Sequence, residues 1–157
     1  MRATHGSIDP GDPWMKTVKE ATPTPAQPAQ HAGLSSFRLM STGKKEEWIA
    51  LFAEDCLFED PVGVSPLDPA GKGHRKSGLA AFWEKSIGLG KMTVECRKAK
   101  PRGKECAFLV DSKNEVAGYP PLEVEAIVIY RVNDAGKIIS VRAFWEYDTS
   151  VQSTLPV

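Results

Sequence analysis

The sequence predicts an α+β fold in which three N-terminal helices cover one face of a strongly curved, mostly antiparallel sheet. Apolar residues recur at helical spacing in the first half of the chain, and strand-like alternation fills the second half. The segment Asn133-Asp134-Ala135-Gly136 is typical of a hairpin turn between the last two strands. Helices followed by consecutive long strands indicate an α+β arrangement. We expect the helices and the sheet to enclose an apolar pocket.

The composition narrows the classes of partner. Twenty basic and twenty acidic residues cancel among 157, so we expect no nucleic-acid partner. No apolar run approaches the roughly 20 residues that span a bilayer, and the first thirty residues lack the apolar core of a secretory signal. The three cysteines form no CxxC motif and each lies in a strand-like run, which favours small core residues over metal ligands. These cysteines are Cys56, Cys96 and Cys106. We expect a cytoplasmic protein.

Three segments are expected along the chain. Residues 1–25 are rich in Pro, Thr, Gly and charge and predict a flexible tail. Residues 26–148 carry the periodic patterns of one ordered domain, and residues 149–157 form a C-terminal tail.

The helices are predicted from apolar faces at helical spacing. The first is expected over residues 26–41, where Pro28 is tolerated in the first turn and Gly43 follows the end. A second helix follows it, and a third covers residues 79–87. The apolar faces consist of Leu34, Phe37 and Met40 in the first helix, Trp48, Ile49, Leu51 and Phe52 in the second, and Phe82 and Trp83 in the third.

The strands are predicted from alternation. A short strand carrying Phe58 and Asp60 lies between the second and third helices, and a long loop over residues 64–76 follows it. The remaining strands are expected over residues 91–98, 105–111, 122–132 and 137–147.

Asp60 is the first candidate functional residue. The alternation Cys56, Phe58, Asp60 places its carboxylate on the same strand face as two residues of buried type, and Pro61 ends the strand directly after it. An isolated carboxylate in an apolar setting is costly unless it is used or paired. Asp60 is therefore either a general base with a raised pKa or a structural carboxylate. Glu59 alternates to the opposite face and is expected to be solvated.

Three segments resemble steroid Δ-isomerases of the ketosteroid isomerase type. They are LFAEDCLFEDPVG at residues 51–63, GLAAFWEKSI at 78–87 and IYRVNDAGKIISVRAFW at 129–145. The resemblance implies the nuclear transport factor 2-like cone, which SnoaL-like cyclases share. It also implies that Asp60 is the base that moves a proton between two carbons of a steroid ketone, with no cofactor and in a homodimer.

The sequence departs from the family at the oxyanion hole, which the family builds from a tyrosine and a protonated aspartic acid. Alignment without gaps places the family's tyrosine on Ser36 and its second aspartic acid on Val128. Substitute hydrogen-bond donors are the Ser36 hydroxyl, the Tyr130 or Tyr147 phenol, the Trp145 indole, or a water molecule.

An aromatic and aliphatic set is the candidate for contact with a hydrophobic, steroid-like molecule. Taken one at a time, each member is more typical of an ordinary core than of a pocket, except Trp145, which falls where the family places an aromatic ring against the bound steroid. The set consists of Phe37, Met40, Phe82, Trp83, Val128, Phe144 and Trp145. Three scattered histidines show no metal-ligand spacing, so no metal site is predicted.

Other functions remain open at this point. A non-catalytic steroid- or lipid-binding module fits the missing oxyanion donors, and a SnoaL-like polyketide cyclase also uses an aspartate base. A protein adaptor of this fold predicts a filled or shallow cavity. Epoxide hydrolysis fits poorly, because its Asp-Arg-Asp group is absent around Arg142. The basic cluster at Lys72, His74, Arg75 and Lys76 is either a solvated loop or a site for an acidic conjugate such as a sulfate.

Overall fold

A computed structural model describes residues 27–146 of the chain. The predicted tails, together with Ala26, Tyr147 and Asp148, lie outside the described residues. In chain order the elements are α2 (Pro28–Ser41), α3 (Lys45–Ile49), β1 (Phe52–Glu59), η1 (Lys76–Gly78), α4 (Leu79–Lys85), η2 (Ile87–Leu89), β2 (Lys91–Arg102), β3 (Glu105–Glu115), β4 (Leu122–Val132) and β5 (Ile138–Phe144).

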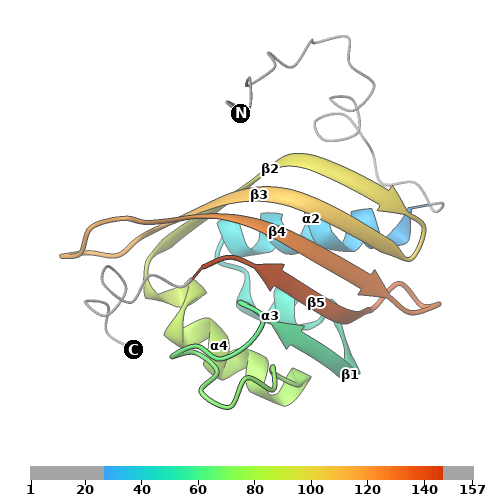
Figure 1. The fold of residues 1–157 in the computed structure, drawn as a ribbon, viewed down its shortest axis with the longest axis horizontal. Helices are drawn as coiled ribbons and strands as arrows, with labels where there is room; N and C mark the ends of the chain where they lie inside the picture. Colours follow the sequence, from blue (N-terminus) through green and yellow to red (C-terminus); the bar gives the residue numbers. More distant parts are fainter. Residues whose placement is uncertain (1–26, 147–157) are drawn as a thin grey trace, which may run out of the picture.

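A five-stranded sheet with the order β1-β5-β4-β3-β2 forms one wall of the molecule. Only the β1–β5 pair is parallel, and the other neighbouring strands pair antiparallel. The sheet is strongly curved, with α2 lying across β2 to β4 and α4 lying below the edge near β1 (Figure 1). The predicted α+β fold, with helices on a curved, mostly antiparallel sheet, is confirmed.

The second helix is shorter than its apolar pattern predicts. It ends at Ile49, and Phe52 is already the first residue of β1. Phe52 pairs with Ile138 of β5, and the Ile138 N–H donates to the Leu51 carbonyl at 2.9 Å. Pairing with the sheet therefore decides the backbone conformation of Leu51 and Phe52, whose side chains fit either period.

Two strands continue beyond their predicted ends. The β2–β3 ladder runs from Lys91 opposite Glu115 to Arg102 opposite Glu105, because each strand completes the hydrogen bonds of the other up to the connecting turn. This extension adds inward-facing positions to β3 that lie beyond residue 111.

Trp48 fixes the short helix α3 to the core. Its side chain is fully buried and packs edge-to-face against Phe52 and Phe58, with ring centroids 4.9 and 5.6 Å apart. Its indole N–H donates to the Ser36 Oγ at 2.9 Å. Burial of this aromatic side chain stabilises α3 more than the intrinsic helix propensity of its five residues does.

Helix α2 packs closely against Phe108 of β3 at Gly33. A Cβ added at Gly33 would lie 2.4 Å from the Phe108 ring, one turn away from the edge-to-face contact of Phe37 with that ring. We expect Gly33→Ala to lower the free energy of unfolding by about 1–3 kcal/mol through overpacking. The better helix propensity of alanine offsets only part of this loss.

Urea denaturation measures this effect. The matched control is Gly78→Ala, because the nearest atom to its added Cβ is 3.7 Å away. A Gly33→Ala variant as stable as the control would contradict the close packing of α2 on β3.

Candidate active site

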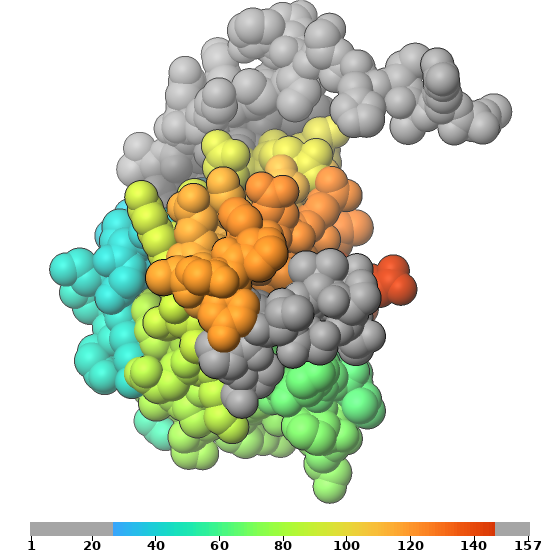
Figure 2. Space-filling view, turned by 90° about the vertical axis from the view of Figure 1, so that its left-hand side faces the viewer, coloured from blue at the N-terminus to red at the C-terminus, as the bar shows by residue number. Residues whose placement is uncertain are grey.

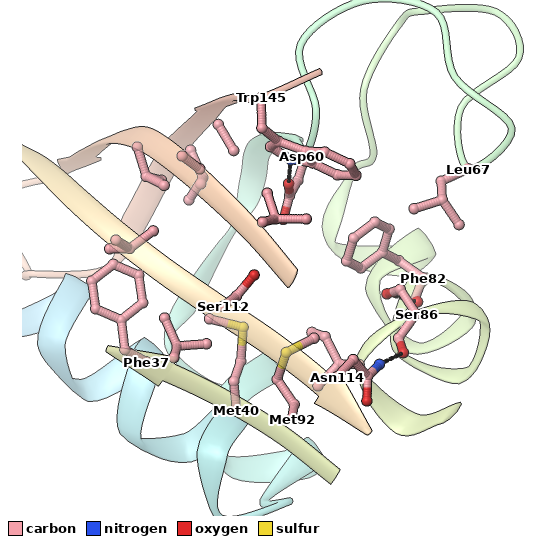
Figure 3. A pocket seen from close by; sticks show the side chains of 18 of the residues that line it. Phe37, Met40, Asp60, Leu67, Phe82, Ser86, Met92, Ser112, Asn114 and Trp145 are labelled. Carbon is pink, nitrogen blue, oxygen red and sulfur yellow. Dashed lines mark hydrogen bonds between the residues drawn. The ribbon is translucent and has the colours of Figure 1, made fainter. Parts of the chain in front are cut away.

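A cavity lies between the concave face of the sheet, α2 and α4 (Figure 3). Its empty space amounts to about 1000 Å³, which includes space open to solvent. The lining is mostly apolar, as is typical of small-molecule sites. A filled or shallow cavity, which an adaptor role would predict, is not what the structure shows.

The register of the strands shows where each lining residue lies along the cavity, from its inner end to its outer end. At the inner end, Phe37, Val128 and Tyr130 are buried, and Tyr130 lies opposite Val141. Toward the outer end, Ser112 lies opposite Val124, and Asn114 lies opposite Leu122, which is partly exposed. Successive inward residues of a strand are about 7 Å apart, so the wall from Tyr130 to Leu122 extends about 25 Å.

Asp60 follows directly after β1 and its carboxyl group faces the cavity beside Trp145 (Figure 3). The Val62 N–H donates to the Ala143 carbonyl at 2.9 Å, which holds the segment after Asp60 against β5. The Trp145 indole N–H donates to the Asp60 Oδ1 at 2.5 Å. The candidate base is thus placed by main-chain pairing on one side and oriented by an indole on the other.

The electrostatic setting of Asp60 follows from this placement. Although part of the residue is accessible, protein atoms surround its carboxyl group, and this burial raises the pKa of Asp60 from its ordinary 3.8 to about 6. The hydrogen bond from Trp145 stabilises the charged form and lowers the pKa relative to burial alone. Asp60 is therefore mostly ionised at pH 7, yet more basic than an exposed aspartate.

Removing the Trp145 indole is expected to raise the pKa of Asp60 above about 6, because burial then acts without the opposing hydrogen bond. NMR titration of the carboxyl carbon in Trp145→Phe measures this pKa. The neighbouring variant Phe144→Leu is the control and should leave the pKa unchanged. An unchanged or lowered Asp60 pKa in Trp145→Phe would contradict the role assigned to the indole.

Ser36, Tyr130 and Trp48 form a buried hydrogen-bonded chain at the inner end. The Trp48 N–H donates to the Ser36 Oγ, and the Ser36 Oγ lies 2.8 Å from the Tyr130 hydroxyl. Tyr130 lines the cavity, whereas Ser36 is fully buried behind it and does not. Of the two candidate donors, the structure therefore brings only Tyr130 to the cavity.

The predicted apolar contact residues divide into two groups. Phe37, Met40, Phe82, Val128 and Trp145 line the cavity. Trp83 and Phe144 do not.

The positions of Trp83 and Phe144 have simple reasons. Trp83 is turned into the core against Trp48, with ring centroids 5.4 Å apart. Phe144 lies on the outer face of the sheet, because successive strand residues point to opposite faces and its neighbour Ala143 faces the cavity. Its side chain is 42% exposed, with the Arg142 guanidinium over the ring. The expectation that these two side chains line the cavity is thus corrected.

Polar residues at the outer end did not emerge from the sequence. Lys85, Ser86, Ser112 and Asn114 all line the cavity there. The alternation of Ser112 with the inward-facing Val110 was a usable signal, but it lay beyond the predicted end of the strand at residue 111.

Two residues of the basic cluster, Arg75 and Lys76, bind the long loop to β1. The Arg75 guanidinium donates to the main-chain carbonyl of Asp55 at 3.2 Å, and Lys76 pairs with Glu54 at 3.3 Å. These contacts attach the loop to β1, and none of the four basic residues lines the cavity.

Other sequence-based expectations have structural outcomes as well. Glu59 lies on the face opposite Asp60, but it is not the solvated charge that was expected, because its side chain is 16% exposed and pairs with Arg142 at 3.0 Å. All three cysteines are free, with Cys56 and Cys106 buried and Cys96 partly exposed. Within residues 27–146, no three His, Cys, Asp or Glu side chains gather as a metal-ligand set. None of the described helices is long and apolar enough to cross a membrane.

Comparison with known proteins gives close matches. Residues 35–141 match the family model of the SnoaL-like domain. The protein RV0760c of Mycobacterium tuberculosis, whose structure contains estradiol-17beta-hemisuccinate, is 35% identical, with a TM-score of 0.74 over 78% of this chain and 96% of that chain. A Delta 5-3-ketosteroid isomerase from Mycobacterium sp. is 31% identical, with a TM-score of 0.72 over 80% and 96%. The epoxide hydrolase/cyclase-like enzyme SalBIII shares the fold at 21% identity and a TM-score of 0.62, over 75% of this chain and 90% of that one.

The family match spans more than half of the chain, and it agrees with the curved sheet and the enclosed cavity. The isomerase and RV0760c are each similar over most of their own length. The chain therefore belongs to the SnoaL-like family, as a steroid isomerase-like member of the nuclear transport factor 2-like superfamily.

Proposed function

We propose that the protein isomerises a Δ5-3-ketosteroid or a similar flat, hydrophobic ketone, with Asp60 as general base. The ionised carboxylate removes a proton from the carbon beside the carbonyl, and the electron pair forms a dienolate whose negative charge lies on the carbonyl oxygen. The same carboxyl group returns the proton to the far end of the dienolate. The double bond is then conjugated with the carbonyl, and Asp60 is ionised again.

The observation that carries this proposal is the enclosed carboxylate in an apolar cavity. A pKa of about 6 leaves Asp60 ionised at neutral pH while bringing its basicity near the operating pH, which favours general base catalysis. Hydrogen bonding to Trp145 keeps one carboxylate oxygen oriented and leaves the other for the substrate.

Tyr130 is proposed as the donor to the developing oxyanion. Either hydroxyl of the Ser36–Tyr130 pair can donate, and we propose that Ser36 donates to the Tyr130 oxygen while its own oxygen accepts from Trp48. Donation then runs from Trp48 to Ser36 to Tyr130 and leaves the Tyr130 proton for a ligand. Burial raises the pKa of Tyr130 well above its ordinary 10, so the phenol remains protonated.

This arrangement accounts for the departure from the family at residue 36. The resemblance places a tyrosine on α2 at that position, and here a small serine lets the Tyr130 phenol reach across from β4. The charge of Asp60 also acts on Tyr130 and raises its pKa, which is consistent with both groups facing one ligand. The phenol is kept, but it is supplied from the opposite wall.

The position of the family's second oxyanion donor carries no hydrogen-bonding side chain here. Val128 occupies its place and lines the cavity with an apolar side chain. One such donor is typically worth about 10²–10³ in rate. We therefore expect an isomerase that is slower than a two-donor enzyme by about this factor.

Conversion of 5-androstene-3,17-dione to its conjugated isomer tests the proposal. The absorbance of the conjugated ketone should rise in the presence of purified protein, faster than in buffer. No acceleration between pH 5 and 8 would overturn the catalytic proposal.

A non-catalytic steroid-binding module is the second candidate, favoured by Val128 at the position of a donor. The steroid found with RV0760c is consistent with this function too. Thermal stabilisation by a ketosteroid that persists in Asp60→Asn, with no turnover by the wild type, would select it. SalBIII supports the cyclase alternative only through its similar fold.

We also propose a cytoplasmic homodimer. Ile127 and Phe144, which pair with each other on the outer face of the sheet, are 53% and 42% exposed, and a second subunit would cover them. The three free cysteines fit a reducing compartment.

A further inference from the structure

The outer end of the cavity carries polar groups that the proposed proton transfer does not use. Asn114 is 5% exposed, and its Nδ2 donates to the Ser86 carbonyl at 2.8 Å. This bond joins β3 to the segment directly after α4. It therefore holds Lys85, the last residue of α4, at the outer end of the cavity.

Ser112 places a hydroxyl inside the apolar cavity. It lies on the inward face of β3, one pleat from Asn114, and Figure 3 shows its oxygen directed into the cavity. Within residues 27–146 this hydroxyl has no hydrogen-bond partner. A hydroxyl in an apolar enclosure is unfavourable unless a ligand or water bonds to it.

Lys85 is the cation of this lining. Its side chain is exposed at the rim, and among the described residues no carboxylate lies within ion-pair distance of it. The adjacent Glu84 is engaged by Lys45 at 2.6 Å. Figure 2 views this side of the molecule, where the yellow-green residues of α4 and η2 adjoin the orange β3–β4 connection.

The distance along the sheet decides what part of a ligand reaches these groups. Ser112 lies opposite Val124, which is six residues from Tyr130 on the same strand, or about 20 Å. Asp60 is hydrogen-bonded to Trp145, which follows Phe144 on β5. Phe144 pairs with Ile127, a position between Val124 and Tyr130 on β4, so Asp60 lies between the outer and inner ends of the cavity. A ligand with its carbonyl at Tyr130 thus directs its remote end toward Ser112 and Lys85.

We propose that the outer end is a second polar subsite that selects ketones bearing a carboxylate on the substituent remote from the carbonyl. Lys85 pairs with the carboxylate, and the Ser112 hydroxyl donates to an oxygen of the same substituent. The inference rests on the proposed function, because it assumes that the ketone end lies at Tyr130 and Asp60.

Equilibrium binding of two ketosteroids to the full-length protein tests the subsite. The probes are testosterone 17-hemisuccinate, which carries a carboxylate, and its neutral methyl ester. At low salt we expect the acid to bind about threefold to fivefold more tightly than the ester, as for an exposed ion pair, and the preference to fade with added salt. Lys85→Met should abolish the preference, Lys85→Glu should reverse it, and Ser112→Ala should weaken both probes.

Lys44→Met is the matched control, because Lys44 is exposed and does not line the cavity. It should bind both probes as the wild type does. Equal binding of acid and ester to the wild type, or a preference that survives Lys85→Met, would overturn the subsite and leave the proposed isomerase intact. Failure of both probes to bind would overturn the proposed function together with the subsite.

Discussion

Asp60→Asn is expected to lower kcat/KM for ketosteroid isomerisation by about 10²–10⁴-fold, the range for loss of a general base. The amide oxygen can still accept the Trp145 N–H, so the cavity keeps its shape, but the amide cannot take up a proton at neutral pH. Initial rates with 5-androstene-3,17-dione measure the effect. In the wild type, kcat/KM should rise with pH through about 6 and level off above 7, as Asp60 ionises.

The same substitution is expected to stabilise the fold above pH 6. The folded-state pKa of about 6 exceeds the ordinary 3.8, so between these values the folded protein binds more protons than the unfolded chain. Wild-type stability therefore falls as the pH rises through this window, by about 3 kcal/mol at most. The Asp60→Asn variant would carry no such loss, so its stability gain over the wild type should be present at pH 8 and absent at pH 4.

Glu59→Gln is the control for Asp60→Asn. Glu59 is the adjacent carboxylate on the opposite face, paired with Arg142 and outside the cavity. It should retain the activity and the pH profile of the wild type. An Asp60→Asn variant that stays active, or that unfolds more readily than the wild type at pH 8, would contradict the assignment of Asp60 as a buried base.

Tyr130→Phe is expected to lower kcat by about 10²–10³-fold, the typical cost of removing one oxyanion donor, with a smaller change in KM. The ring stays in place against Phe37 and Phe108, with centroids 5.5 and 5.6 Å away, so the cavity wall is preserved. Steady-state kinetics of the variant separate the two parameters. A Tyr130→Phe variant with unchanged kcat would show that the donor lies elsewhere, and Trp145 would then be the next candidate.

Ser36→Ala separates the positioning role of Ser36 from the catalytic role of Tyr130. The phenol stays, but it loses the hydroxyl that orients it, so kcat should fall by less than in Tyr130→Phe. The variant also leaves the buried Trp48 N–H without its acceptor, which should lower the free energy of unfolding by about 1–3 kcal/mol. A loss of kcat as large as that of Tyr130→Phe would contradict this division of roles.

Much of the fold was predictable because its patterns are local. The apolar face of α2 and the alternation of β4 place their elements within a residue or two of the observed bounds. Leu51 and Phe52 were misplaced because a short apolar run fits both periods, and only pairing with β5, which lies more than 80 residues away, resolves the choice.

The site was predictable where the alternation of side chains along a strand decides which residues face the cavity. This alternation places Asp60, Val128 and Trp145 toward the cavity, and it could also have excluded Phe144 from the lining. The Ser36–Tyr130 bond joins residues 94 positions apart, which no local pattern reveals. The polar outer end was hidden for a similar reason, since the length of β3 depends on its partner β2.

A crystal structure of the protein with a bound 3-ketosteroid is the most direct test of the central claim that Asp60 and Tyr130 act on one ketone. We predict the carbonyl oxygen about 2.6–3.2 Å from the Tyr130 hydroxyl and the Asp60 carboxylate over the carbon beside the carbonyl. A ketone bound with its carbonyl at the Lys85 end, away from both groups, would contradict it.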